Sequence, residues 1–100
     1  MDVEALLTGA GYRVLGPVNS APAAFALIEN EDPDIALLDI NLRQSNVFTL
    51  ADYLGTRKTK VIFLSGHSQL VLPDAHRHRK LIGKPFMLSE LLRALQEESR

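Results

Sequence analysis

The sequence feature that most restricts the fold of this chain is a run of four apolar residues that ends at a carboxylate. Residues 35–38, Ile-Ala-Leu-Leu, follow Asp32-Pro33-Asp34 and end at Asp39. A short apolar run bounded by turn residues is typical of a parallel strand that is buried on both faces. An acid directly after such a strand lies at the rim where open α/β sheets place their functional sites. The sequence therefore predicts a buried strand that carries Asp39 to a site.

Two later segments have the same form and end in other polar residues. Residues 61–64 are followed by Ser65 and Gly66, and residues 81–83 are followed by Lys84. Because the carboxyl ends of parallel strands meet at one edge of a sheet, we expect Asp39, Ser65 and Lys84 to converge. A carboxylate can act as a nucleophile toward phosphorus, and a hydroxyl and an ammonium group stabilise phosphoryl oxygens. The set suits phosphoryl chemistry, and Gly66 leaves room for a phosphoryl group beside Ser65.

Apolar residues at helical spacing alternate with the strands. This spacing predicts helices near residues 2–10, 21–28, 47–54 and 88–95, the last capped by Ser89, and a further strand at 12–16. Residues 66–80 are irregular, with at most a short helix and a densely charged, solvated stretch. Strands that alternate with helices indicate an α/β fold with a doubly wound parallel sheet of about four strands and helices on both faces. We interpret residues 1–100 as a single domain.

The composition excludes several classes of function. The apolar fraction of 46% and charged fraction of 23% are those of an ordinary globular domain. A net charge of −1 argues against nucleic-acid binding, and the absence of cysteine excludes disulfides and thiolate metal sites. No apolar run approaches the roughly 20 residues that span a bilayer, and the N-terminus lacks a signal-peptide pattern. We therefore expect a cytoplasmic protein without a membrane or nucleic-acid partner.

Three short motifs at the strand ends resemble those of a known family. Leu-Leu-Asp at 37–39, Leu-Ser-Gly at 64–66 and Lys-Pro-Phe at 84–86 are similar, in this order, to the receiver domain of bacterial two-component response regulators. The resemblance covers essentially the whole chain and implies a flavodoxin-like fold. It implies that Asp39 accepts a phosphoryl group from a sensor histidine kinase or phosphotransfer protein. It also implies that Ser65 is the switch hydroxyl and that Lys84 is the phosphate-binding lysine. His67 would lie at the mouth of the site, and the Lys84–Pro85 peptide would be cis.

The sequence departs from the family pattern in three respects. The opening strand of the family and the acidic pair at its end are absent, and Leu81 stands near the place of the usual aromatic switch residue. The resemblance implies a Mg²⁺ ion held by that acidic pair, by Asp39 and by the Asn41 carbonyl. Asp2 and Glu4 are no substitute for the pair, because they lie on a predicted helix. We interpret the chain as a truncated version of a longer receiver or as a degenerate one, and we expect weak Mg²⁺ binding.

Other functions remain as alternatives to a phosphoacceptor that signals through a protein partner or a homodimer. One is a pseudo-receiver, which keeps the fold as an interaction domain without phosphorylation. Another is an aspartate-nucleophile phosphohydrolase, although that class has Asp-x-Asp where this chain has Asp-Ile-Asn at 39–41. We interpret His67, His76 and His78 as solvated loop residues rather than metal ligands, since the chain has no cysteine and His-x-His alone is a weak metal signal.

Overall fold

The computed structural model describes residues 3–16, 18, 21–40, 46–66 and 72–99. These residues belong to two compact units, Met1–Pro33 and Asp34–Arg100, which we describe separately. The first contains α1 (Val3–Gly9) and α2 (Ala21–Asn30). The second contains β1 (Ile35–Ile40), α3 (Asn46–Thr56), β2 (Lys60–Ser65), the 3₁₀ turn η1 (Asp74–His76), β3 (Lys80–Gly83) and α4 (Leu88–Glu98). None of the helices within the described ranges is both long and apolar enough to cross a membrane.

In the first unit, α1 ends at Gly9, and Gly11 shapes the turn that follows. Gly11 has a φ of 96°, a left-handed conformation that glycine adopts without strain. The Tyr12 N–H donates to the Leu7 carbonyl at 3.0 Å and the Gly11 N–H to the Thr8 carbonyl at 3.1 Å. These two bonds form a Schellman motif, which satisfies carbonyl groups at the end of the helix.

The strand predicted at residues 12–16 is not formed. Residues 12–16 have no regular secondary structure, and the sheet of the described residues has three strands rather than about four. A strand is stable only when its backbone groups pair with a neighbour. The sequence of residues 12–16 is typical of a strand, but it does not show whether another strand lies beside it.

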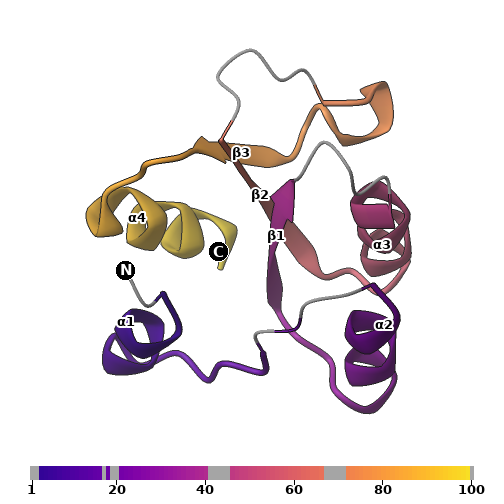
Figure 1. The fold of residues 1–100 in the computed structure, drawn as a ribbon, viewed down its shortest axis with the longest axis horizontal. Helices are drawn as coiled ribbons and strands as arrows, with labels where there is room; N and C mark the ends of the chain where they lie inside the picture. Colours follow the sequence, from indigo (N-terminus) through magenta and orange to yellow (C-terminus); the bar gives the residue numbers. More distant parts are fainter. Residues whose placement is uncertain (1–2, 17, 19–20, 41–45, 67–71, 100) are drawn as a thin grey trace. The chain divides into compact units, whose positions relative to one another are not determined.

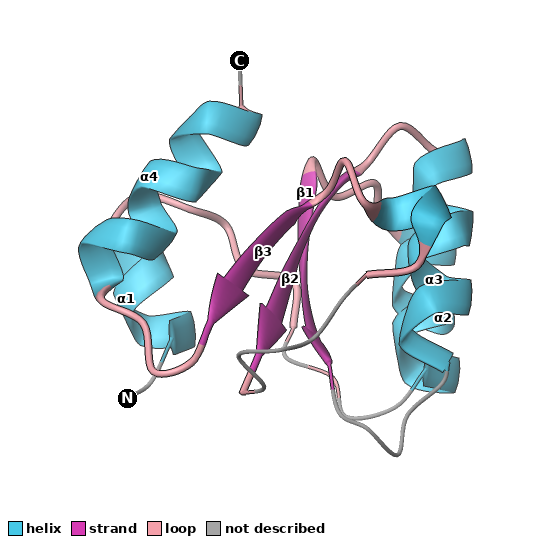
Figure 2. Cartoon of the chain, turned by 90° about the horizontal axis from the view of Figure 1, so that it is seen from above, coloured by secondary structure: helices cyan, strands magenta, loops and turns pink. Residues whose placement is uncertain are grey.

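The second unit is a parallel three-stranded sheet in the order β1-β2-β3, with β2 in the middle (Figure 1). Helix α3 lies on one face of the sheet and α4 on the opposite face (Figure 2). This arrangement confirms the α/β class. The predicted apolar face of α3 is buried, and so are most of β2 and one face of α4. The buried apolar residues of these three elements are Val47, Leu50, Ala51, Leu54, Val61, Ile62, Phe63, Leu64, Leu91, Ala94 and Leu95.

The most buried strand is β2, not β1. Residues 61–65 are all buried, whereas residues 35–38 are only half-buried, so the prediction of a fully buried 35–38 strand is wrong. The cause is position in the sheet, because β2 has a strand on each side and β1 lies at an edge. The Lys60 N–H donates to the Asp34 carbonyl at 3.0 Å, and backbone groups alternate sides along a strand. The N–H and C=O groups of Ile35, Leu37 and Asp39 therefore point away from β2.

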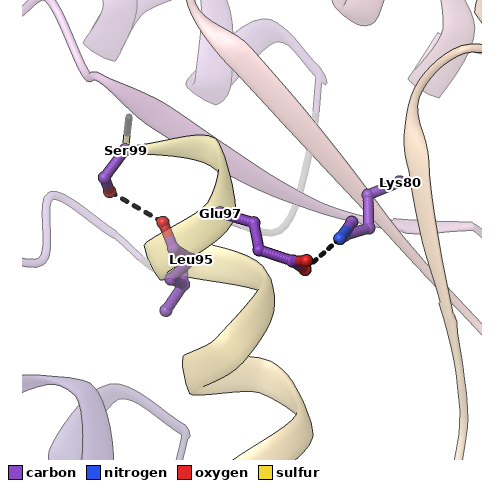
Figure 3. Close-up of polar contacts among 4 residues, drawn as sticks. All are labelled: Lys80, Leu95, Glu97 and Ser99. Carbon is purple, nitrogen blue, oxygen red and sulfur yellow. Dashed lines mark hydrogen bonds and ion pairs between the residues drawn. The ribbon is translucent and has the colours of Figure 1, made fainter.

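Helix α4 is tied to the sheet by a polar contact as well as by its apolar face. The Lys80 ammonium at the start of β3 bonds the Glu97 carboxylate near the end of α4 (Figure 3). The Ser99 hydroxyl donates to the Leu95 carbonyl at 2.7 Å and closes the last turn of the helix. The predicted cap at Ser89 is wrong, since the helix starts after Met87 and Ser89 is its second residue. Met87 has extended backbone and no capping side-chain bond.

Candidate functional site

The three polar residues predicted from the strand ends lie at the same edge of the sheet. Asp39 is the penultimate residue of β1, Ser65 the last residue of β2, and Lys84 follows β3 directly. In the parallel register, Ile40 pairs with Ser65 and Ser65 pairs with Gly83. Since all three strands run in the same direction, this register brings an acid, a hydroxyl and an ammonium group to the carboxyl-terminal edge.

Asp39 and Lys84 form a direct ion pair. The Lys84 Nζ donates to Asp39 Oδ2 across 45 residues of sequence. The side chain of Asp39 is 61% exposed and that of Lys84 is 37% exposed. An ion pair this exposed to water adds little to fold stability. The exposure leaves the Asp39 carboxylate open to a reaction partner from solvent.

Ser65, the neighbour of Lys84 across the sheet, is buried. The residue is 1% exposed, and its carbonyl accepts a hydrogen bond from the Lys84 N–H at 2.6 Å. That bond extends the β2–β3 ladder by one residue and fixes the backbone of Lys84 beside the end of β2. The Lys84–Pro85 peptide is cis, as the resemblance implied.

Open space adjoins Gly66, the residue after Ser65. A Cβ atom added at Gly66 would meet no atom within 4 Å. Room for a phosphoryl group beside Ser65 stays a prediction. Leu81, near the predicted place of an aromatic switch residue, is 37% exposed. Asn41 and His67 lie outside the described residues, so their predicted places at the site stay predictions.

The carboxylates of the described residues do not form a metal site. Asp39 bonds Lys84, and no group of three or more His, Cys, Asp or Glu side chains that could hold a metal ion occurs within the described ranges. Mg²⁺ prefers several oxygen ligands in octahedral geometry, and a single carboxylate holds it weakly. The described donor set therefore does not fit Mg²⁺.

One histidine differs from its prediction. His76 was expected in a solvated stretch, but it is 3% exposed, and its Nε2 lies 2.8 Å from Asp52 Oδ1. His78 is exposed as predicted. Nothing in the local sequence around His76 distinguishes it from His78, because its partners belong to α3 and β2. Only the three-dimensional fold brings these elements together.

Comparison with known proteins identifies the class. The sequence pattern of the response regulator receiver domain matches residues 1–96. The chain therefore belongs to the response regulator receiver domain family, whose members are signalling domains of two-component systems. Receiver domains generally bind Mg²⁺ at an acidic site and interact with histidine kinases or phosphotransfer proteins.

A solved structure supports the same assignment. The chain is similar to SdrG from Pseudomonas melonis Fr1, whose solution structure shows the BeF3-activated conformation, with a TM-score of 0.77 and 28% sequence identity. The match covers 94% of this chain and 80% of the SdrG chain. Among curated proteins, no sequence matches the chain significantly. The fold class and family predicted from the strand-end motifs are thus confirmed.

Proposed function

We propose that residues 1–100 act as one phosphoacceptor domain in a histidine-to-aspartate phosphorelay. An Asp39 carboxylate oxygen attacks the phosphorus of a phosphohistidine on a sensor histidine kinase or phosphotransfer protein. The new O–P bond forms as the P–N bond breaks, and the imidazole nitrogen leaves with the bonding electron pair. The phosphorylated domain then signals through a protein partner, with a homodimer as the alternative form of output.

The ion pair between Asp39 and Lys84 carries this proposal. Phosphorylation replaces one carboxylate charge with a phosphoryl group of about −2. The Lys84 ammonium, already on the Asp39 carboxylate, is placed to move onto a phosphoryl oxygen. Ser65 ends the neighbouring strand next to Lys84, so we assign its hydroxyl to a second phosphoryl oxygen. In this proposal Asp39 is the nucleophile, Lys84 the charge partner and Ser65 the switch hydroxyl.

A phosphorylation-independent pseudo-receiver is the second candidate, because the described carboxylates do not form a Mg²⁺ site. Without a second cation, Lys84 alone opposes the charge that accumulates on transfer. In such a protein the Asp39–Lys84 pair is a fixed part of an interaction surface. The family match favours either form of receiver over the phosphohydrolase.

Chemical trapping of an acyl phosphate separates the two candidates. The purified chain, extended at its N-terminus by an apolar strand that ends in two acidic residues, is treated with acetyl phosphate and Mg²⁺, reduced with borohydride, digested and analysed by mass spectrometry. A phosphoacceptor gives reduced aspartate at position 39, and Asp39→Asn removes that signal. Asp34→Asn is the matched control, since Asp34 is also exposed but lies at the opposite end of β1. We expect it to leave the trapping unchanged. Trapping at Asp34, or at several acids equally, would contradict the assignment of Asp39.

A further inference from the structure

Two basic runs of the sequence each lead directly into a strand of the sheet. Residues 57–60, Arg-Lys-Thr-Lys, end with the first residue of β2, and residues 77–80, Arg-His-Arg-Lys, end with the first residue of β3. Each run holds three of the eleven lysine and arginine residues of the chain. Because β2 and β3 are parallel neighbours, both runs lie at the amino-terminal edge of the sheet, opposite the edge that carries Asp39 and Lys84. We call the lysine and arginine side chains of these two runs the basic edge.

Carboxylates of the chain neutralise only part of the basic edge. Arg77 and Lys80 each pair with a carboxylate of their own unit. Lys58, Lys60 and Arg79 form no ion pair with any of the described residues. A shortage of acids does not explain this, since the chain has 12 acidic residues and 11 lysines and arginines. The basic edge is therefore a local positive patch on a chain of net charge −1.

Arg79 is held in place by packing against α3. A Cβ atom at Gly55 would lie 2.8 Å from the Arg79 Nη2, so the guanidinium lies against the helix where there is no side chain. Arg79 is half-buried, and its Nε is buried without a hydrogen-bond partner among the described residues. Asp52, the only carboxylate of α3, bonds His76 instead. A guanidinium that is already fixed and partly desolvated loses little freedom when a carboxylate binds it, and such arginines are typical of binding hot spots.

Two exposed lysines accompany Arg79 at the end of α3. The Lys58 N–H donates to the Gly55 carbonyl at 3.2 Å, so Lys58 and the Arg79 guanidinium both lie beside Gly55. Lys60 follows two residues later and is exposed at the start of β2. Cations at the end of a helix also complement the helix dipole, but this effect is confined to the last turn. It accounts for neither Lys60 nor the basic run at 77–80.

We propose that the basic edge is a docking surface for an acidic segment of a partner protein, whose carboxylates pair with the three unneutralised cations. Carboxylates of the chain itself stand among these cations. The Lys60 N–H donates to the carbonyl of the exposed Asp34 at 3.0 Å, and Asp74 and Glu97 each pair with a cation of the edge. They repel the uniformly negative backbone of a nucleic acid, whereas a protein segment can place polar or basic residues opposite them. The surface lies away from Asp39 and stands whether or not Asp39 is phosphorylated.

Titration of the full chain into a fluorescein-labelled oligoglutamate peptide, followed by fluorescence anisotropy, tests this surface. We expect saturable binding at about 0.15 M salt, weakened several-fold by Arg79→Gln and by Lys60→Gln. Lys60 is exposed, so its variant keeps the test valid even where Arg79→Gln disturbs the packing on α3. Arg93→Gln is the matched control, because it removes the same charge from an exposed position of α4 outside the basic edge. Absence of saturable binding, or an equal loss from Arg93→Gln, would overturn the proposal.

Nitrogen-15 spectra of the unaltered chain locate the bound peptide. Shift changes should concentrate on the amides of residues 57–60 and 77–80, and changes centred on Asp39 and Lys84 would contradict the proposed surface. An oligothymidylate of equal charge should bind several-fold more weakly than oligoglutamate, and tighter binding would overturn the choice of a protein segment. Sedimentation of the chain alone should show a monomer. A dimer that Arg79→Gln abolishes would overturn the proposal in favour of a second copy of the chain as the occupant.

Discussion

Replacing Ile62 by alanine should destabilise the second unit far more than the same change at Ile35. Ile62 is fully buried in the middle of β2, with Leu37 of β1 and Lys80 of β3 beside it in register. The change removes roughly three methylene equivalents, or about 2.4 kcal/mol of transfer free energy. Since strands on both sides limit collapse of the cavity, a further cost of about 1 kcal/mol is expected. We predict a loss of about 3.4 kcal/mol of unfolding free energy from Ile62→Ala.

Ile35 is the matched control, because it is also an isoleucine in a strand but is half-buried at the edge of the sheet. Its replacement by alanine should cost about 1 kcal/mol, since much of the side chain already contacts water. Urea denaturation followed by circular dichroism measures both free energies of unfolding, provided that the m-values stay equal. Equal losses at the two positions would show that β1 is as central to the packing as β2, and would refute the burial order described above.

Two further substitutions test local features of the second unit. Lys58 has a φ of 63° and occupies the left-handed position that ends α3, where the Thr59 N–H donates to the Leu54 carbonyl. Lys58→Gly should therefore stabilise the chain by about 0.5 kcal/mol. This value is the strain energy that glycine relieves at this φ, reduced by the larger conformational entropy that glycine loses on folding. A lower urea midpoint for this variant would contradict that expectation. Glu97→Gln breaks the pair with Lys80, whose side chains are 33% and 48% exposed, and should cost less than about 0.5 kcal/mol. Thermal melts at low and high salt check this, and a large, salt-independent loss would show that the pair is essential for holding α4.

The sequence predicted the parts of the fold that depend on local patterns. Apolar spacing gave the buried face of α3, and turn residues gave the strands that end near Asp39, Ser65 and Lys84. Their convergence was also predictable, because parallel strands in sequence order place their carboxyl ends together. The Gly11 turn that ends α1 follows from the conformational freedom of glycine.

Features that depend on neighbours were not predictable in the same way. The half-burial of residues 35–38 results from the edge position of β1. The apolar pattern of a strand does not show whether the strand lies at an edge or in the middle of a sheet. The 12–16 segment has a strand pattern but no pairing partner in the sheet. Lys58 ends α3 in a conformation usually taken by glycine, so the sequence carries no glycine signal at this end. His76 is buried by contacts with residues at positions 48, 52 and 63, which lie far from it in sequence.

The central claim is that Asp39 is the phosphoryl acceptor and that its phosphorylation needs an acidic pair that residues 1–100 do not supply. The edge-facing backbone groups of Ile35, Leu37 and Asp39 are the groups with which an added parallel strand would pair, and the end of that strand would lie beside Asp39. Within the described part of their own unit, no backbone hydrogen bond to them is seen on that side of β1. The chain can therefore be extended at its N-terminus by an apolar strand that ends in two acidic residues.

Intact-mass spectrometry after acetyl phosphate treatment, with and without Mg²⁺, tests this claim most directly. We predict little labelling of the chain with the present sequence, and Mg²⁺-dependent addition of one phosphoryl group to the extended chain. Asp39→Asn in the extended chain should abolish the addition. Efficient Mg²⁺-dependent labelling of the unextended chain would show that the acidic pair is dispensable. Labelling that persists in Asp39→Asn would contradict Asp39 as the acceptor.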